Sequence, residues 1–187
     1  MSFSPLSDLS MKENSYTIKA PFIAREFEFR YSAAFLPLLV LLGRLTFGFY
    51  FLWSGFDKLF SDFTSTGFLV NASQGPLESV FVELGESSTA VDIIDPLVVW
   101  GQILIGAALF LGIFTRFALL MAATQMFLFY LPALWPEHNP ILDEHIFYIG
   151  IFAILGALGA GRILGLDAWI EEAEFVKRNP ALQWLLG

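Results

Sequence analysis

Four long apolar stretches constrain what this chain can fold into. A helix that crosses the roughly 30 Å hydrocarbon layer of a membrane needs about 20 mostly apolar residues. The stretches that meet or nearly meet this length are Ala33–Phe56, Pro96–Phe114, Phe117–Trp135 and His145–Ala160. The first contains a single charged residue, Arg44, and the second and third contain none. The sequence therefore predicts an all-α integral membrane protein, built as a bundle of four transmembrane helices.

The composition agrees with a membrane protein and excludes several functions. Charged residues make up 15% of the 187 positions, whereas a soluble domain carries about 25%. The net charge of −8 argues against a nucleic-acid partner, because phosphates are bound by basic patches. The absence of Cys excludes disulfides, thiolate metal sites and Fe–S clusters. The two histidines, His138 and His145, lie near one membrane edge, where they are poorly placed to bind a haem inside the bundle.

The distribution of basic residues predicts the orientation in the membrane. Lys and Arg cluster in the N-terminal tail, between the second and third stretches, and after the fourth stretch. The positive-inside rule places such segments in the cytoplasm, so we expect both termini there and the acidic loops 57–95 and 137–144 outside. Three regions follow: a cytoplasmic tail over 1–32, a four-helix domain over 33–162, and a cytoplasmic amphipathic tail over 163–187.

Two shorter amphipathic helices are expected outside the bundle. The first follows Gly75-Pro76 and lies on the outer end of the bundle. Its apolar residues at helical spacing are Leu77, Val80, Phe81 and Leu84. The second is capped by Asp167 and rests on the cytoplasmic surface or on another subunit. Its apolar side comprises Leu166, Trp169, Ile170, Ala173 and Val176.

Arg44 is the most informative polar residue. It lies about ten residues into the first stretch, or roughly 15 Å from the cytoplasmic edge, which is close to the depth expected for Gln125 in the third. An Arg at mid-membrane costs about 2.5–3.5 kcal/mol on insertion scales, so it should face the bundle interior. The spans contain no Asp or Glu, and the amides of Gln102 and Gln125 are the nearest candidate partners. Arg44 then either locks helices together through amides and backbone carbonyls, or binds an anion or a polar head group such as a quinone carbonyl.

A second polar cluster is expected at the outer membrane edge. Its members are Trp53, Asp57, Lys58, Asp95, Trp100, Tyr130, Glu137, His138, Asp143, Glu144, His145 and Tyr148. The aromatic residues are typical of an interfacial belt. Asp143, Glu144 and His145 could instead exchange protons during quinol oxidation, because His titrates near neutral pH. A metal site is disfavoured, since the ligand spacing is not distinctive.

Several short motifs resemble DoxX/DoxD-type membrane proteins. The segment 43–59, which contains Gly43-Arg44 and Trp53-Ser-Gly55-Phe-Asp-Lys58, is similar to their first span. Segments 100–116, from Trp100-Gly-Gln to Thr115-Arg116, and 143–167 resemble their second and fourth spans, so the likeness runs from about residue 36 to 170. Many relatives have Glu where this chain has Gln102, which favours an accessory role here.

The resemblance implies a quinone-linked redox role in a prokaryotic cell membrane. DoxD is a membrane subunit of archaeal thiosulfate:quinone oxidoreductase, so the implied cofactor is a quinone and the implied partners are lipid and other subunits of a membrane redox complex. The implied site residues are Arg44, Lys58 and the group from Asp143 to His145. The alternative is a non-catalytic scaffold subunit of a larger membrane complex, which the lack of redox ligands favours. A transporter is disfavoured because repeats and interrupted spans are absent.

Overall fold

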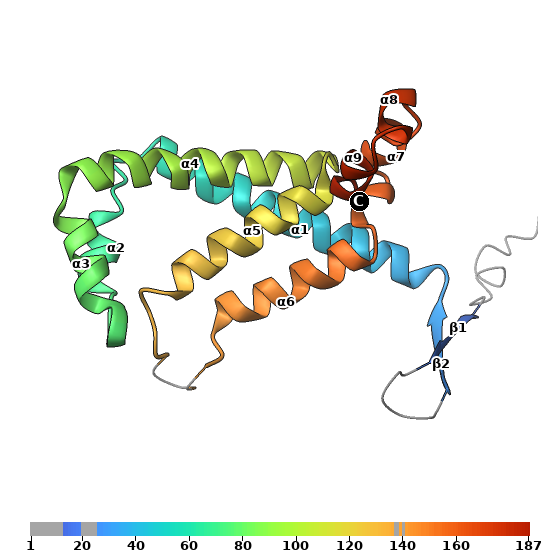
Figure 1. The fold of residues 1–187 in the computed structure, drawn as a ribbon, viewed down its shortest axis with the longest axis horizontal. Coiled ribbons are helices and arrows are strands. Elements are labelled where there is room, and N and C mark those ends of the chain that lie inside the picture. Colours follow the sequence, from blue (N-terminus) through green and yellow to red (C-terminus); the bar gives the residue numbers. More distant parts are fainter. Residues whose placement is uncertain (1–12, 20–25, 137–138, 140) are drawn as a thin grey trace, which may run out of the picture.

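A computed structural model describes residues 13–19, 26–136, 139 and 141–187 of the chain. Four helices form its body: α1 (Phe35–Leu59), α4 (Ser88–Leu111), α5 (Thr115–Tyr130) and α6 (Glu144–Ala157) (Figure 1). Each of them overlaps one of the four apolar stretches. The prediction of an all-α fold is therefore confirmed.

The surface of the long helices is apolar. Leu38, Leu42 and Phe49 on α1 and Leu97 and Leu104 on α4 each expose between 48% and 67% of their surface. A helix that is hydrophobic on all sides belongs in a large protein core or in a membrane, and the elements in the described part of the chain leave much of α1 and α4 uncovered. Both helices are long enough to cross a bilayer. Helices α5 and α6 have 16 and 14 residues, so the count of four complete spans stays a prediction.

The four helices form two pairs that are joined at one end. Helix α1 packs against α4, and α5 packs against α6. The pairs meet at the α4–α5 turn and diverge towards the other end of the molecule, where α2 (Thr66–Asn71) and α3 (Glu78–Glu86) lie (Figure 1). We call the α1–α4 pair and the α5–α6 pair two arms. They pack together on one side, where Phe47 and Phe51 of α1 contact Phe152 of α6 in a shared core, and they are separated between α4 and α5.

The α1–α4 pair depends on two glycines that let the backbones touch. A Cβ atom at Gly48 would lie 2.7 Å from the backbone nitrogen of Phe110. A Cβ at Gly106 would collide with the backbone nitrogen of Leu52. Small residues allow such close approach where helices pack in a membrane.

The connection between α1 and α4 bridges the open ends of the two arms. The predicted amphipathic helix is present as η1 (Gly75–Leu77) and α3, whereas α2 was not predicted. On one side, the Ser65 amide donates to Asp95 Oδ1 of α4 at 2.8 Å. On the other, the Gln74 amide donates to the Pro132 carbonyl after α5 at 2.8 Å.

The predicted start of the second span at Pro96 is wrong. Helix α4 begins eight residues earlier, at Ser88, because the Ser87 hydroxyl accepts the Ala90 amide and caps the helix. Ser is a favoured N-cap residue. Pro96 lies inside the helix, and the outer loop is shorter than expected.

Both terminal regions also differ from expectation. The stretch after Asp167 forms three short helices, α7 (Asp167–Ile170), α8 (Glu174–Lys177) and α9 (Pro180–Leu185), and not one amphipathic helix. The N-terminal tail contains an antiparallel hairpin of β1 (Glu13–Lys19) and β2 (Glu26–Ser32). Alternating charged and aromatic residues over 26–32 carry the period of a strand, which agrees with β2.

Gly106→Ala should loosen the α1–α4 pair, because the new methyl group meets backbone and cannot be relieved by a rotamer change. We expect a loss of about 1–3 kcal/mol, the usual cost of overpacking, seen as a lower midpoint of thermal unfolding in lipid nanodiscs. Gly150→Ala is the matched control, since a Cβ there has no atom within 4 Å. It should leave the midpoint unchanged or raise it, and equal losses in both variants would contradict the proposed packing.

Candidate functional site

The guanidinium of Arg44 is buried at the joined end of the two arms. Its Nη1 donates to the carbonyls of Ala160 and Ile163 at 2.8 and 3.0 Å, and its Nη2 donates to that of Leu164 at 3.2 Å. Only 1% of the residue is exposed. These carbonyls follow the C-terminal end of α6, where a cation is favoured by the helix dipole.

Asp167 complements Arg44 on the other side of the same segment. Its buried carboxylate accepts the amides of Phe114 and Thr115 at 2.7 and 2.9 Å, and that of Gly187 at 2.9 Å. The prediction that Asp167 caps its own helix is therefore wrong, because it binds the N-terminus of α5, where an anion is favoured. Phe114 has a φ of +46°, a strained value for a residue with a side chain, and its bond to Asp167 helps to hold it.

The segment 160–167 thus links α1 to the α4–α5 turn, and we call this set of bonds the Arg44–Asp167 clamp. The backbone completes it, since the Asp167 amide donates to the Gly112 carbonyl at 2.8 Å. The structure supports the interpretation in which Arg44 locks helices together through backbone carbonyls.

The expectation that Arg44 and Gln125 lie at one depth is wrong. A Cβ at Gly112 would be 2.7 Å from Arg44 Nη1, whereas Gln125 Nε2 donates to the Val98 carbonyl at 3.4 Å. From Val98 to Gly112 is 14 residues, or about 21 Å of helix. The first turns of α1 project past the α4–α5 turn (Figure 1), so counting from the start of the apolar stretch placed Arg44 too deep.

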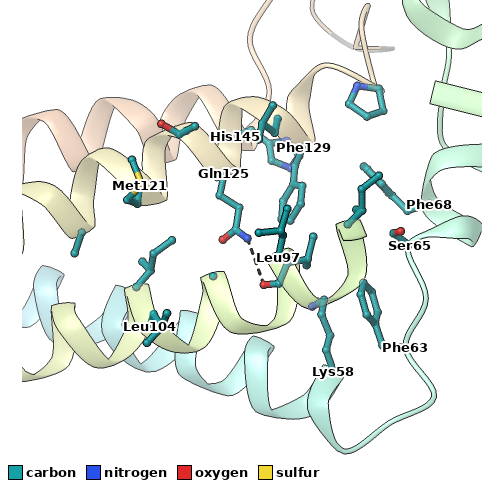
Figure 2. A pocket seen from close by; sticks show the side chains of 18 of the residues that line it. Lys58, Phe63, Ser65, Phe68, Leu97, Leu104, Met121, Gln125, Phe129 and His145 are labelled. Atoms are coloured by element: carbon teal, nitrogen blue, oxygen red, sulfur yellow. Dashed lines mark hydrogen bonds between the residues drawn. The ribbon is translucent and has the colours of Figure 1, made fainter. Parts of the chain in front are cut away.

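A cavity of about 1040 Å³ lies between α4 and α5 and extends to α2 and α3; we call it the α4–α5 groove. Its walls are almost entirely apolar. They include Leu97 and Leu104 of α4, Met121 and Phe129 of α5, Phe68 of α2, and Phe81 and Leu84 of α3 (Figure 2). Because the exposed faces of α4 are apolar, the groove is suited to an apolar molecule that comes from the bilayer.

Polar side chains gather at the end of the groove near α2 and α3. Lys58 and Ser65 line it there, and Gln125 and His145 line it between these two residues and Met121 (Figure 2). Lys58 Nζ donates to the Ser54 carbonyl at 3.3 Å and lies 5.4 Å from the centre of the Phe63 ring. Ser65 Oγ and Gln125 Oε1 are buried and have no hydrogen-bond partner among the described residues. Such atoms are costly unless a ligand or water satisfies them.

The predicted proton-exchange group lies at the wall of this polar end. Asp143 caps α6 by accepting the Ile146 amide at 3.2 Å, and its other oxygen lies 2.7 Å from His145 Nδ1. If Nδ1 carries the proton, Nε2 is left as an acceptor. The His145 ring packs edge-on against Phe129. Asp143, Glu144 and His145 offer ligand atoms within 4.8 Å of one another, and nothing beyond that proximity indicates a metal.

The other predicted site residues divide between two places. Lys58 and Gln125 line the groove, whereas Arg44 is in the clamp. Gln102 lies between α1 and α4, where a Cβ at Gly55 would be 3.2 Å from its Cβ, and it does not line the groove. Glu137 and His138 lie outside the described residues. Ser65 was not predicted, because a single Ser in a loop carries no signal until α2 places it.

Replacing Arg44 by Met should destabilise the protein strongly. The buried Ala160 carbonyl and the partly buried carbonyls of Ile163 and Leu164 would lose their donor. A buried group left unsatisfied costs about 1–3 kcal/mol, so the midpoint of thermal unfolding in nanodiscs should fall by on the order of 10 °C. Arg162→Met is the control, because Arg162 is half-exposed and pairs with Glu171 on the surface, where such pairs contribute about 0–1 kcal/mol. A similar shift in both variants would show that the Arg44–Asp167 clamp is not structural.

One of the comparisons with known proteins gives a match. The family model DoxX matches residues 39–135, just over half of the chain. The matched region contains Arg44, Lys58, Gln102 and Gln125, and it ends before the group at Asp143. No curated protein and no solved structure matches the chain.

Proposed function

Because the chain belongs to the DoxX family, whose proteins are membrane-associated, we propose that it is a membrane subunit of a quinone-linked oxidoreductase. In this proposal the α4–α5 groove holds the quinone. The observation that carries it is the combination of a long apolar groove with unpartnered polar atoms at one end only. Ligand sites of this kind use a few polar groups to orient a mostly apolar molecule.

The chemistry of the polar end suits a quinone head group. A quinone presents carbonyl oxygens, and the Ser65 hydroxyl can donate to one of them. A quinol presents hydroxyl groups, and Gln125 Oε1 can accept from one of them. Both protein atoms lack a partner among the described residues. The head then lies near α2 and α3, and the tail lies along Leu104 and Met121.

Arg44, which was a candidate for anchoring the head group, is not needed for this site. Three of its donor hydrogens are taken by carbonyls of the segment after α6. Its distance from Gln125, about 21 Å along α4, exceeds the size of a quinone ring. We therefore assign Arg44 to the clamp and head-group binding to Ser65 and Gln125, with Lys58 beside them.

His145 and Asp143 can accept and pass on a proton at the head-group end. Reduction of a quinone to a quinol takes up two electrons and two protons, so this pair, linked at 2.7 Å, would deliver protons to the reduced head group as a general acid and take them up again from outside. With both termini in the cytoplasm, as the charge distribution predicts, this end of the groove faces the outside of a prokaryotic cell membrane.

Electrons must come from a partner subunit, since the chain has no Cys and few groups that hold a redox centre. The resemblance to DoxD would make thiosulfate the donor. The net charge of −8 does not favour an anion at this chain, so in this proposal the partner binds the donor.

Gln125→Leu should weaken quinone binding by up to about tenfold, the value of one good hydrogen bond. The measurement is the affinity of the purified protein in nanodiscs for a quinone with a short tail. Gln102→Leu is the matched control, because it removes the same amide group at a buried position between α1 and α4 that does not line the groove. If both variants bind as the unmodified protein does, the groove is not the head-group site.

A non-catalytic scaffold subunit is the second candidate, and the lack of redox ligands in the sequence favours it. His145→Gln distinguishes the two in the complex isolated from its native membrane. If His145 handles protons, quinone-dependent turnover should fall by roughly 10²-fold or more, while the affinity for quinone stays the same. Unchanged turnover in an intact complex would favour the scaffold.

A further inference from the structure

The dimensions of the α4–α5 groove point to the tail of its ligand. We propose that the groove selects a single long tail of the isoprenoid type, which runs from the polar end across the middle of the bilayer to the α4–α5 turn. This inference rests on the proposed function for the identity of the head group. The tail argument itself depends only on the shape of the groove.

The groove is longer than one leaflet of a membrane. Its lining on α4 extends from Ile94 to Ala108, which is 14 residues or about 21 Å of helix. Beyond α4 it continues to Ile113 and Phe114 in the turn. One leaflet contributes half of the roughly 30 Å hydrocarbon layer, or about 15 Å. The acyl chain of a phospholipid, which ends near the midplane, would leave the far part of the groove to other molecules.

The polarity of the groove gives the tail one direction. The unpartnered atoms of Ser65 and Gln125 lie towards α2 and α3, and Figure 2 shows Leu104 and Met121 on the side away from Lys58 and Ser65. The lining continues from there to Ala108 and Phe117. A head group bound by Ser65 and Gln125 therefore sends its tail towards Ala108.

The two walls of the groove, α4 and α5, meet at the α4–α5 turn, which sets a limit to the useful length. The Arg44–Asp167 clamp fixes the α4–α5 turn, because Phe114 and Thr115 are bonded to Asp167 and Gly112 is bonded to its amide. The two arms cannot separate further at this point without breaking buried hydrogen bonds. A tail that reaches the turn fills the groove, and any additional isoprene units would lie outside the groove.

The test uses a series of quinones that share one head group and differ in the number of isoprene units. Affinity is measured in nanodiscs and expressed per mole fraction of quinone in the bilayer, so that partition into lipid does not contribute. We expect affinity to rise with tail length by on the order of tenfold and then to level off. A flat series would overturn the tail inference, and binding of the short-tailed members would leave the proposed function standing.

A variant at the far end locates the effect. Ala108→Phe should fill the groove near the turn and abolish the gain from long tails, while short-tailed quinones keep their affinity. Ala107→Phe is the control, because Ala107 is the next residue on α4 and does not line the groove; it should keep the gain. If the affinity of the Ala108→Phe variant still rises with tail length, the inference is overturned.

Labelling gives a second readout that does not depend on the folding of a variant. A long-tailed quinone with a photoreactive group at the end of its tail should label the unmodified protein near Ile113 and Phe117. Labelling confined to residues near Phe68 and Leu84 would reverse the direction of the tail and overturn the inference. If the unmodified protein binds no quinone of the series, including the short-tailed ones, the proposed function itself is rejected.

Discussion

The structure depends on how a buried guanidinium satisfies its donors. A charge removed from water is stable only when it is hydrogen-bonded, and the interior of this protein offers Arg44 no carboxylate within hydrogen-bonding distance among the described residues. The free carbonyls after the last turn of α6 accept three of its hydrogens, while its Nε has no partner among the described residues. Asp167 does the reverse, since it accepts the free amides at the start of α5. One short segment, 160–167, therefore bonds to α1 on one side and to the α4–α5 turn on the other.

The position of this clamp explains how the two arms are arranged. It fixes the two arms at one end, and the glycines at 48 and 106 hold α1 and α4 in close contact along their length. At the other end the connection that contains α2 and α3 bonds to both arms, at Ser65 and Gln74, and between the ends α1 packs on α6 through Phe47 and Phe152. The arms are thus held at both ends and along the α1–α6 side, and the α4–α5 groove is the space that remains on the other side.

Much of this fold could be predicted from the sequence, because apolar length and helical spacing are local properties. The four apolar stretches and the helix at Glu78–Glu86 follow from them. The depth of Arg44 could not be predicted, since it depends on how far α1 projects beyond its neighbours. The start of α4 could not be predicted either. A proline is favoured at the start of a helix, which pointed to Pro96, but the helix begins after the Ser87 cap upstream. The C-terminal stretch forms three short helices and not one amphipathic helix, and its Gly187 amide bonds to Asp167.

The candidate site could also be predicted only in part. Gln125, Lys58 and His145 stood out because polar residues are rare in such a chain, and the structure brings all three to one groove. Gln102 has the same chemistry, but its position on the α1 side of α4 keeps it out. Which side of a helix faces a space between two arms is a tertiary property. Ser65 and the apolar lining could be found only from the structure.

The most direct measurement is an experimental density map of the protein purified with its native lipid in nanodiscs. The account predicts elongated density between α4 and α5, with its wider end beside Ser65 and Gln125 and its narrow end near the α4–α5 turn. It also predicts only protein carbonyls around Arg44. A map in which α4 and α5 close against each other, or in which a bound head group contacts Arg44, would contradict it.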